Sequence, residues 1–252
     1  MAEPIRGLEG VVAATTGLSR VDGEAGRLSY VGYDIHDLAE HATFEEVAFL
    51  LWHRRLPRAA ELDAFRAELA RERELTDEAA DALRRAPATA HPMEALRFAV
   101  AALALADPDV HDNAPDATLR KAVRLTARFP TALAAFHRWR SGAAPVPPDP
   151  ALGHAANFLY MLFGRRPDEE AARAIDVALV LLADHGLNAS TFTARVVAST
   201  LADLHSAVVA ALGALRGPLH GGAAEAVMKM LLEIGEPDRA DAYVRERLAR
   251  KE

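Results

Sequence analysis

The chain has 252 residues, and its 36 acidic against 29 basic side chains give a formal net charge of −7. This balance offers no basic field for nucleic acid, and the absence of cysteine excludes disulfides, thiolate zinc sites and cysteine nucleophiles. The start of the chain lacks the basic and apolar regions of a secretory signal, and no apolar run approaches the roughly 18 residues that span a membrane. We therefore expect a soluble cytoplasmic protein with neither a nucleic-acid nor a membrane partner.

The first 35 residues carry the β signal of the sequence. Residues 11–16 and 27–31 are β-branched or alternating stretches on either side of an Asp22-Gly23 pair, which supplies turn chemistry with positive φ. This pattern predicts a small hairpin at about 11–31, too short to form a domain.

From Thr43 onward the pattern is helical almost without a break, which predicts an all-α fold. Thr43 and Glu46 form a capping box that starts the first of these helices. Apolar residues at helical spacing, with proline or capping signals at their ends, predict further helices over 59–73, 76–86, 91–106, 116–139, 152–163 and 167–184. Pro130 lies inside one of these segments as a candidate kink. The proline-rich stretch 141–150 is short enough to be a loop within one domain.

The segment 191–215 reads as one helix that is apolar on nearly every side. Such a helix is expected inside a bundle or at a subunit interface. Two more helices are expected over 223–234 and 239–252. The last one ends without glycine or a cap, which suggests a boundary imposed on the sequence rather than a natural terminus.

His220 stands out among the ten histidines because glycines and a proline surround it, between the end of one predicted helix and the start of the next. Glycine lets the backbone approach a ligand closely, and a helix N-terminus offers free amide donors to an anion. The positive helix end also favours a neutral imidazole, which could donate a hydrogen bond to a polarised carbonyl. A glycine-rich turn with a solvent-facing histidine is the alternative, and the spacing alone slightly favours it.

His185 follows an apolar helix and precedes Gly186 and Asn188. An imidazolium there could bind a carboxylate, and a cation is favoured at a helix C-terminus. The alternative is an ordinary helix end, with Asn188 as the N-cap of the next helix. His41, His53, His111 and His137 have polar neighbours typical of the surface, whereas His36 and His205 are ambiguous. Histidine spacing does not favour a metal site, and the glycines lack the context of a phosphate loop.

Several motifs, in the same order along the chain, resemble the citrate synthase family. They are residues 7–12 with 32–39, the stretch 43–51, His-Pro-Met at 91–93, Asn-Phe-Leu-Tyr-Met at 157–161, and the run from Asp-His at 184–185 to Gly-Pro-Leu-His-Gly-Gly at 217–222. The resemblance covers the whole chain. It implies a multi-helical large domain over residues 1–220 that includes the hairpin, and the beginning of a small helical domain over 221–252.

The resemblance also implies a reaction, a Claisen-type condensation of acetyl-CoA with oxaloacetate followed by thioester hydrolysis to citrate and CoA. His220 matches the family's histidine that donates a hydrogen bond to the thioester oxygen as the enol forms. His185 matches a histidine that binds oxaloacetate. The family needs no metal or redox cofactor and forms homodimers, for which the apolar segment 191–215 is our candidate interface.

Two features of the family are missing from this sequence. A second histidine and the aspartate that removes the methyl proton normally follow a Lys-Glu pair like Lys251-Glu252. We therefore expect this chain alone to be an inactive fragment. Gly186 and Ala224 also differ from the acidic residue and the asparagine that are frequent there.

Two other interpretations remain open. One is a 2-methylcitrate synthase that uses propionyl-CoA, because one methylene discriminates modestly and its pocket is not readable in the sequence. The other is a non-catalytic truncated paralogue that binds a full-length subunit through the 191–215 segment.

Overall fold

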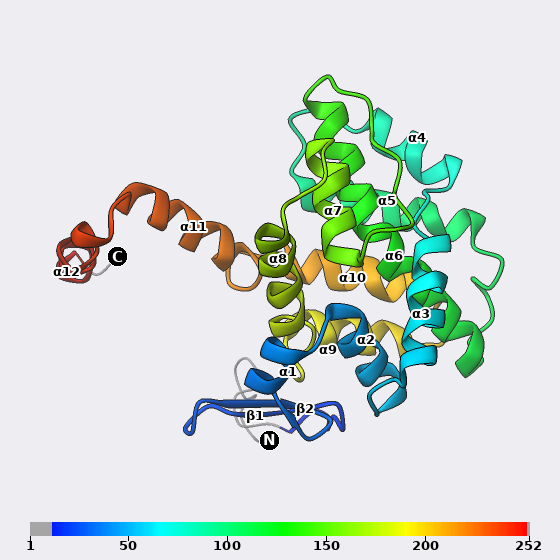
Figure 1. The fold of residues 1–252 in the computed structure, drawn as a ribbon, viewed down its shortest axis with the longest axis horizontal. Helices are drawn as coiled ribbons and strands as arrows, with labels where there is room; N and C mark the ends of the chain where they lie inside the picture. Colours follow the sequence, from blue (N-terminus) through cyan, green and yellow to red (C-terminus); the bar gives the residue numbers. More distant parts are fainter. Residues whose placement is uncertain (1–11, 251–252) are drawn as a thin grey trace, which may run out of the picture.

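The computed structural model describes residues 12–250, and it is helical apart from one small sheet (Figure 1). The helices are α1 (Ile35–His41), α2 (Phe44–His53), α3 (Ala59–Arg71), α4 (Asp77–Arg85), α5 (Pro92–Leu103), α6 (Pro115–Arg140), α7 (His154–Phe163), α8 (Glu169–Leu181), α9 (Ala189–Ala198), α10 (Leu204–Leu215), α11 (Gly222–Ile234) and α12 (Ala240–Ala249), with short 3-10 turns at Ala104–Ala106 and Pro237–Arg239. The predicted all-α class is confirmed. None of the helices within 12–250 has the length and hydrophobicity needed to cross a bilayer.

The predicted N-terminal hairpin is present, but the position predicted for its first strand is wrong. Strand β1 is Ser19–Asp22 and pairs antiparallel with β2 (Arg27–Tyr30), while residues 12–16 form no strand and Val11 lies outside the described residues. The turn is closed by Asp22, whose carboxylate accepts the Ala25 N–H at 2.9 Å, and by Gly26 at φ +63°. A four-residue loop therefore replaces the tight Asp-Gly turn, and a third strand, β3 (Tyr33–Asp34), extends the sheet.

Tyr30 fixes this sheet to the helical body. Its side chain is fully buried, and its hydroxyl lies 3.1 Å from the carbonyl oxygens of Val180 and Leu181. The same hydroxyl accepts the Asp184 N–H at 3.2 Å, at the start of the loop between α8 and α9. The β-sheet thus holds in place the loop that carries His185.

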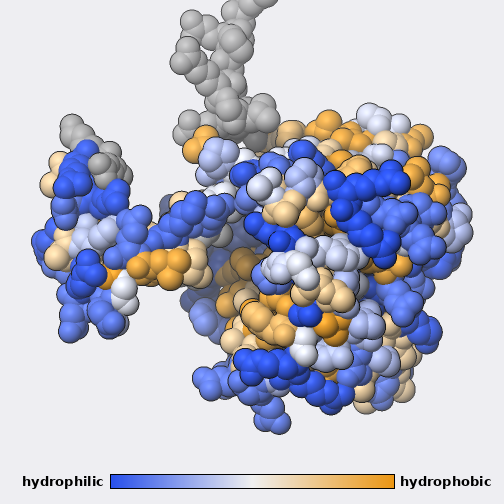
Figure 2. Space-filling model, turned by 90° about the horizontal axis from the view of Figure 1, so that it is seen from above, coloured by the Kyte–Doolittle hydropathy of each residue, from blue (hydrophilic) through white to orange (hydrophobic). Residues whose placement is uncertain are grey.

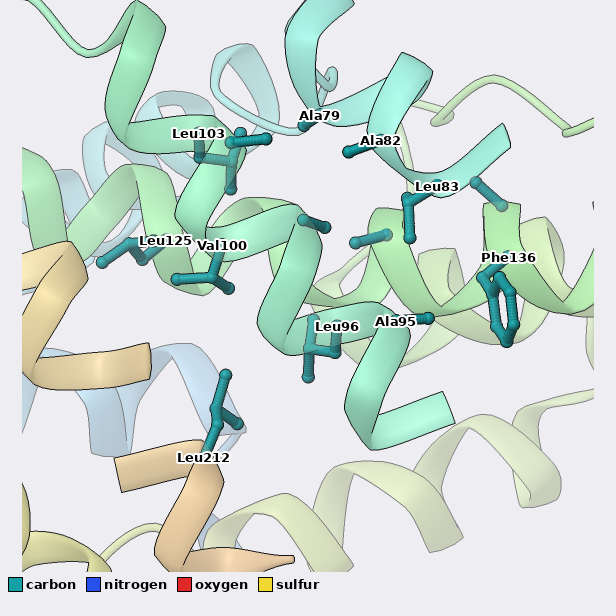
Figure 3. Packing of buried hydrophobic residues seen from close by; sticks show 14 residues of the cluster. Ala79, Ala82, Leu83, Ala95, Leu96, Val100, Leu103, Leu125, Phe136 and Leu212 are labelled. Carbon is teal, nitrogen blue, oxygen red and sulfur yellow. The ribbon is translucent and has the colours of Figure 1, made fainter. Parts of the chain in front are cut away.

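The largest core surrounds α5. Figure 3 shows Leu96, Val100 and Leu103 of α5 among side chains of its neighbours. These neighbours are α4 with Leu83, α6 with Phe136 and α10 with Leu212. The apolar faces predicted from the sequence meet here, because each helix buries its apolar stripe against another helix.

The local start and stop signals of the helices are largely those expected. Thr43 and Glu46 form the predicted capping box of α2, with the Glu46 carboxylate 2.8 Å from the Thr43 backbone nitrogen. The helix α6 runs through Pro130 as one element, so the proline is accommodated without ending the helix.

The predicted single helix over 191–215 is wrong, because the chain divides there into α9 and α10. Leu201 takes φ +63°, and the Asp203 carboxylate then accepts the Ser206 N–H at 2.9 Å to cap α10. The hydroxyls of Ser199 and Thr200 donate to carbonyls of the last turn of α9, which helps to end that helix. No residue of α9 is buried in this chain, whereas α10 buries His205, Ala207 and Leu212.

The last two helices leave the body as an arm (Figure 1). Helix α11 projects outward, and α12 lies at its far end. Figure 2 shows apolar surface along this arm, where Val227, Met228, Leu231 and Leu232 are about half exposed or more. The predicted helix over 239–252 corresponds to α12, and residues 251–252 lie outside the described part.

Candidate active site

A cavity of about 780 Å³ opens where four helix ends and the α8–α9 loop meet. The starts of α5, α9 and α11 and the end of α10 contribute to its wall. His185 and His220, singled out on separate grounds in the sequence, both line it. The fold therefore brings together two side chains that are 35 positions apart in the chain.

The position of His220 depends on an unusually close approach of backbone to backbone. A Cβ atom at Gly221 would lie 2.4 Å from the Leu215 carbonyl oxygen, and one at Gly222 would lie 3.1 Å from the Gly217 carbonyl oxygen. Gly222 donates its N–H to the Gly217 carbonyl at 3.1 Å, which closes the turn. Only glycine fits at 221 without displacing the chain, so the turn places His220 next to the N-terminus of α11.

Ser190 holds the imidazole of His220 at the cavity wall. The Nε2 atom of His220 lies 3.0 Å from the Ser190 hydroxyl, which in turn lies 2.7 Å from the Asn188 amide oxygen. The hydroxyl donates its single proton to the Asn188 amide oxygen, so towards His220 it accepts, and the neutral ring carries its proton on Nε2. Among the described residues Nδ1 has no hydrogen-bond partner, and it carries the ring proton instead when the Ser190 hydroxyl turns from Asn188 and donates to Nε2.

His185 lies in the loop after α8, not within the helix end. Helix α8 ends at Leu181, and Asn188 caps α9 by accepting the Thr191 N–H at 2.9 Å, as the sequence suggested. Gly186 takes φ +65° and donates its N–H to both Ser19 and Asp184 at 3.0 Å, which fixes the loop around the histidine. The His185 ring is exposed and has no hydrogen-bond partner among residues 12–250.

A polar pair that we did not predict, His91 and Glu225, closes another part of the wall. The His91 Nδ1 accepts the Met93 N–H at 3.2 Å, so its Nε2–H is the donor that faces the Glu225 carboxylate at 3.3 Å. Lys229 donates to the other Glu225 oxygen at 2.7 Å. The Lys229 and His91 hydrogen bonds lower the pKa of Glu225.

The sequence contained signals for some of these partners but not for their meeting. Pro92 and the His-Pro-Met motif marked a helix start, and Asn188 marked another. Ser190 follows Asn188 by two positions, where a side chain at the first turn of a helix can reach back to the cap. Nothing in the local pattern linked Ser190 to His220 or Glu225 to His91, because these contacts span 30 and 134 positions.

The remaining histidines lie away from this cavity. His41, His53, His111 and His137 are exposed, as expected, and His36 is exposed beside Asp34. His205 is buried against Asp107 at 3.4 Å, and His154 is buried against the Phe44 ring. Within residues 12–250, no three histidine, aspartate or glutamate side chains form a group that could hold a metal ion.

A family model described as "Citrate synthase, C-terminal domain" matches residues 7–252. Citrate synthase 2 of Bacillus subtilis is 50% identical over 248 residues, which are 98% of this chain and 66% of that protein. A 2-methylcitrate synthase of Mycobacterium tuberculosis is 45% identical over 247 residues, 98% of this chain and 62% of that protein. The chain thus spans slightly less than two thirds of these curated relatives.

A solved citrate synthase structure also has the fold of this chain. The ternary complex of carboxymethyl coenzyme A and oxaloacetate with citrate synthase from Thermoplasma acidophilum superimposes with a TM-score of 0.91 at 32% identity, covering 99% of this chain and 66% of that one. The match of the family model over nearly the whole sequence and this agreement in fold lead to one conclusion. The chain belongs to the citrate synthase family.

Proposed function

We propose that the cavity belongs to the active site of a citrate synthase, which condenses acetyl-CoA with oxaloacetate and releases citrate and CoA. The observation that carries this proposal is that His185 and His220 line one cavity in a chain of this family. The related Thermoplasma acidophilum structure was solved with carboxymethyl coenzyme A and oxaloacetate, which are an acyl-CoA analogue and the keto acid. The proposed enzyme is an acyltransferase and uses acetyl-CoA as a substrate, with no metal or redox cofactor.

In this proposal His220 stabilises the enol of the thioester. Removing a methyl proton next to a thioester places negative charge on its oxygen, and a fixed donor aimed there lowers the barrier by about 3–4 kcal/mol in comparable oxyanion sites. For this role the Ser190 hydroxyl turns from Asn188 and donates to Nε2, which lies 3.0 Å away, and the ring proton on Nδ1 is then the free donor.

His185 is proposed to bind a carboxylate of oxaloacetate or a neighbouring oxygen. Its ring is exposed at the cavity and free of hydrogen bonds to the described residues, while the loop backbone around it is fixed by Gly186. A histidine held in this way can donate to an anion without first breaking another contact.

The carboxylates that line this cavity are poorly suited to remove the methyl proton. The Asp184 carboxylate accepts the Gly186 N–H at 3.0 Å. Lys229 lowers the pKa of Glu225, so Glu225 is a weaker base than an ordinary glutamate. Since acid and base residues act as a unit, we propose that residues 1–252 alone bind substrate and turn over little or none of it.

Calorimetric titration of the 252-residue chain with oxaloacetate tests the proposal. We expect His185→Gln to weaken oxaloacetate binding about tenfold, because a charge-assisted hydrogen bond is lost. His111→Gln serves as the matched control, since His111 is exposed and distant from the cavity wall, and it should leave the affinity unchanged.

The same chain is then assayed for thiol release from acetyl-CoA in the presence of oxaloacetate. Robust release would contradict the proposal that the carboxylates of this cavity are poorly suited to act as the base. Unaltered oxaloacetate affinity in His185→Gln would contradict the proposed binding site.

A second candidate, a 2-methylcitrate synthase, is favoured by the 45% identity to the Mycobacterium tuberculosis protein of that name. Met93, Leu182 and Leu215 line the cavity and provide apolar surface for either acyl chain. The specificity constants for acetyl-CoA and propionyl-CoA, measured on a version of the protein as long as its relatives, distinguish a citrate synthase from a 2-methylcitrate synthase. One extra methylene changes the specificity constant by a measurable factor of roughly 10–200.

The proposed enzyme is a homodimer that uses the α9–α10 region. Exposed apolar side chains such as Val196, half exposed on α9, support this choice. The same surface would serve a non-catalytic paralogue that binds a full-length subunit. The cytoplasmic location stays a prediction of the sequence.

A further inference from the structure

Arg216 is a cation of the cavity with no role in the mechanism above. It directly follows the last residue of α10 and lies four positions before His220. Among the described residues that line the cavity it is the only lysine or arginine. Any cationic contact that this part of the wall offers to a substrate, apart from a protonated histidine, therefore comes from Arg216.

The guanidinium of Arg216 lacks the hydrogen-bond partners that Arg73 and Arg124, the arginines buried in the described chain, have. Its Nε is sealed from solvent and has no hydrogen-bond partner, and no ion pair joins its head to any residue within 12–250. By contrast, Arg124 pairs with Asp107 and Asp109 at 2.6 and 2.7 Å. A buried donor without a partner destabilises the folded chain, so such a group calls for an explanation.

The acidic groups of the same wall do not neutralise Arg216. Glu225 is engaged by Lys229 and by His91, at 2.7 and 3.3 Å. The Asp184 carboxylate accepts a backbone N–H and forms no ion pair with Arg216 in the described structure. Arg216 is thus not paired with a carboxylate among the described residues of this wall.

We propose that Arg216 is an anion-binding residue of this cavity and that it contacts carboxylate or phosphate oxygens of a substrate. A guanidinium presents donors in a planar fork that matches both groups. The inference rests on the proposed function for the identity of the anion, since oxaloacetate carries two carboxylates and acetyl-CoA carries phosphates.

A purely structural role for Arg216 makes a different prediction. A cation next to the C-terminus of α10 interacts favourably with the helix dipole and so stabilises the fold slightly. A side chain kept only for this purpose would affect the unfolding temperature and leave ligand affinity unchanged. Lysine would replace it fully in that role.

The test compares wild type, Arg216→Gln and Arg216→Lys as 252-residue chains by calorimetric titration. The probes are oxaloacetate, coenzyme A, 3′-dephospho-coenzyme A and pyrophosphate. Arg245→Gln is the matched control, because Arg245 pairs with Asp241 on α12 and its loss changes the net charge equally. Thermal unfolding of each variant shows whether it is folded.

We expect Arg216→Gln to lower the affinity for at least one anionic probe about tenfold or more. Arg216→Lys should lower that affinity less, because lysine keeps the positive charge but lacks the planar fork of donors. Loss confined to oxaloacetate assigns the carboxylate. If Arg216→Gln lowers the affinity for coenzyme A more than the affinity for 3′-dephospho-coenzyme A, the residue contacts the 3′-phosphate. If it lowers both affinities equally, the residue contacts the diphosphate.

The outcomes separate this proposal from the function on which it rests. If wild type binds neither oxaloacetate nor coenzyme A, the proposed function fails. Loss of pyrophosphate binding in Arg216→Gln would then still support an anion site. The assignment of Arg216 is overturned if Arg216→Gln binds every probe with wild-type affinity. It is also overturned if the loss of affinity is no greater than in the Arg245→Gln control.

Discussion

His154 and His220 differ in surroundings that the sequence could not distinguish. His154 is 5% exposed and packs on the Phe44 ring at 4.8 Å between centroids. Burial lowers the pKa of His154 to about 4, and the positive charge of Arg73 contributes to the same shift. His220 instead lies at an open cavity beside a hydroxyl. Solvent access therefore separates a structural histidine from a candidate catalytic one.

His154 should make the protein less stable in mild acid. The unfolded chain takes up a proton at this histidine near pH 6.5, whereas the folded chain resists until about pH 4. Its contribution to the free energy of unfolding should thus fall by about 2 kcal/mol between pH 7 and pH 5. Urea unfolding at the two pH values measures this loss, and His154→Phe should reduce it.

Direct titration of the histidine C2 protons by NMR provides a readout that does not depend on the variant. His137→Gln, which alters an exposed histidine, should keep the wild-type pH dependence. A His154 that titrates near pH 6.5 in the folded protein would refute this account.

Among the elements, the boundaries of α9, α10 and α11 determine where the side chains of the candidate site lie. The sequence pattern gave one long apolar helix, but Leu201 and the Asp203 cap divide it. The second boundary is the glycine turn after α10, where the backbone of Gly221 packs so closely on the Leu215 carbonyl that no Cβ atom fits between them. This turn, rather than either helix, sets the direction of His220.

Gly221→Ala should destabilise the fold by about 1–3 kcal/mol, because its Cβ would lie 2.4 Å from the Leu215 carbonyl oxygen and the chain must shift. Gly213→Ala is the matched control, since its Cβ would meet Arg97 at an ordinary 3.7 Å inside α10. That change should be neutral or stabilising by up to about 1 kcal/mol. Chemical denaturation measures both variants, and equal effects would show that the close approach is unimportant.

At the scale of the whole molecule, much apolar surface lies outside the core around α5. It includes Val196 on α9 and Leu232 on the arm formed by α11 and α12, which are 50% and 74% exposed. Surface of this kind on a folded chain commonly marks an interface. The proposed homodimer would cover the part that lies on α9.

We expect wild type to sediment as a dimer and Val196→Glu to sediment as a monomer, since the interface would have to bury an unpaired carboxylate. Val244→Glu makes the same chemical change at a 43% exposed position on α12, outside the proposed interface, and should remain dimeric. Sedimentation velocity distinguishes the species. A monomeric wild type, or a Val196→Glu variant that remains dimeric, would exclude α9 as the interface.

The sequence by itself determined the helical class, most helix limits and the two histidines worth following, because periodicity, caps and glycine clusters are local properties of the chain. It missed the break at Leu201, where the apolar pattern continues although the backbone turns, and it misplaced the first strand, whose residues Ser19–Asp22 are mostly polar. Only the tertiary structure decided that Ser190 contacts His220, that Arg216 lacks a partner, and that His154 is buried. Those facts depend on contacts between distant parts of the chain, which no local pattern specifies.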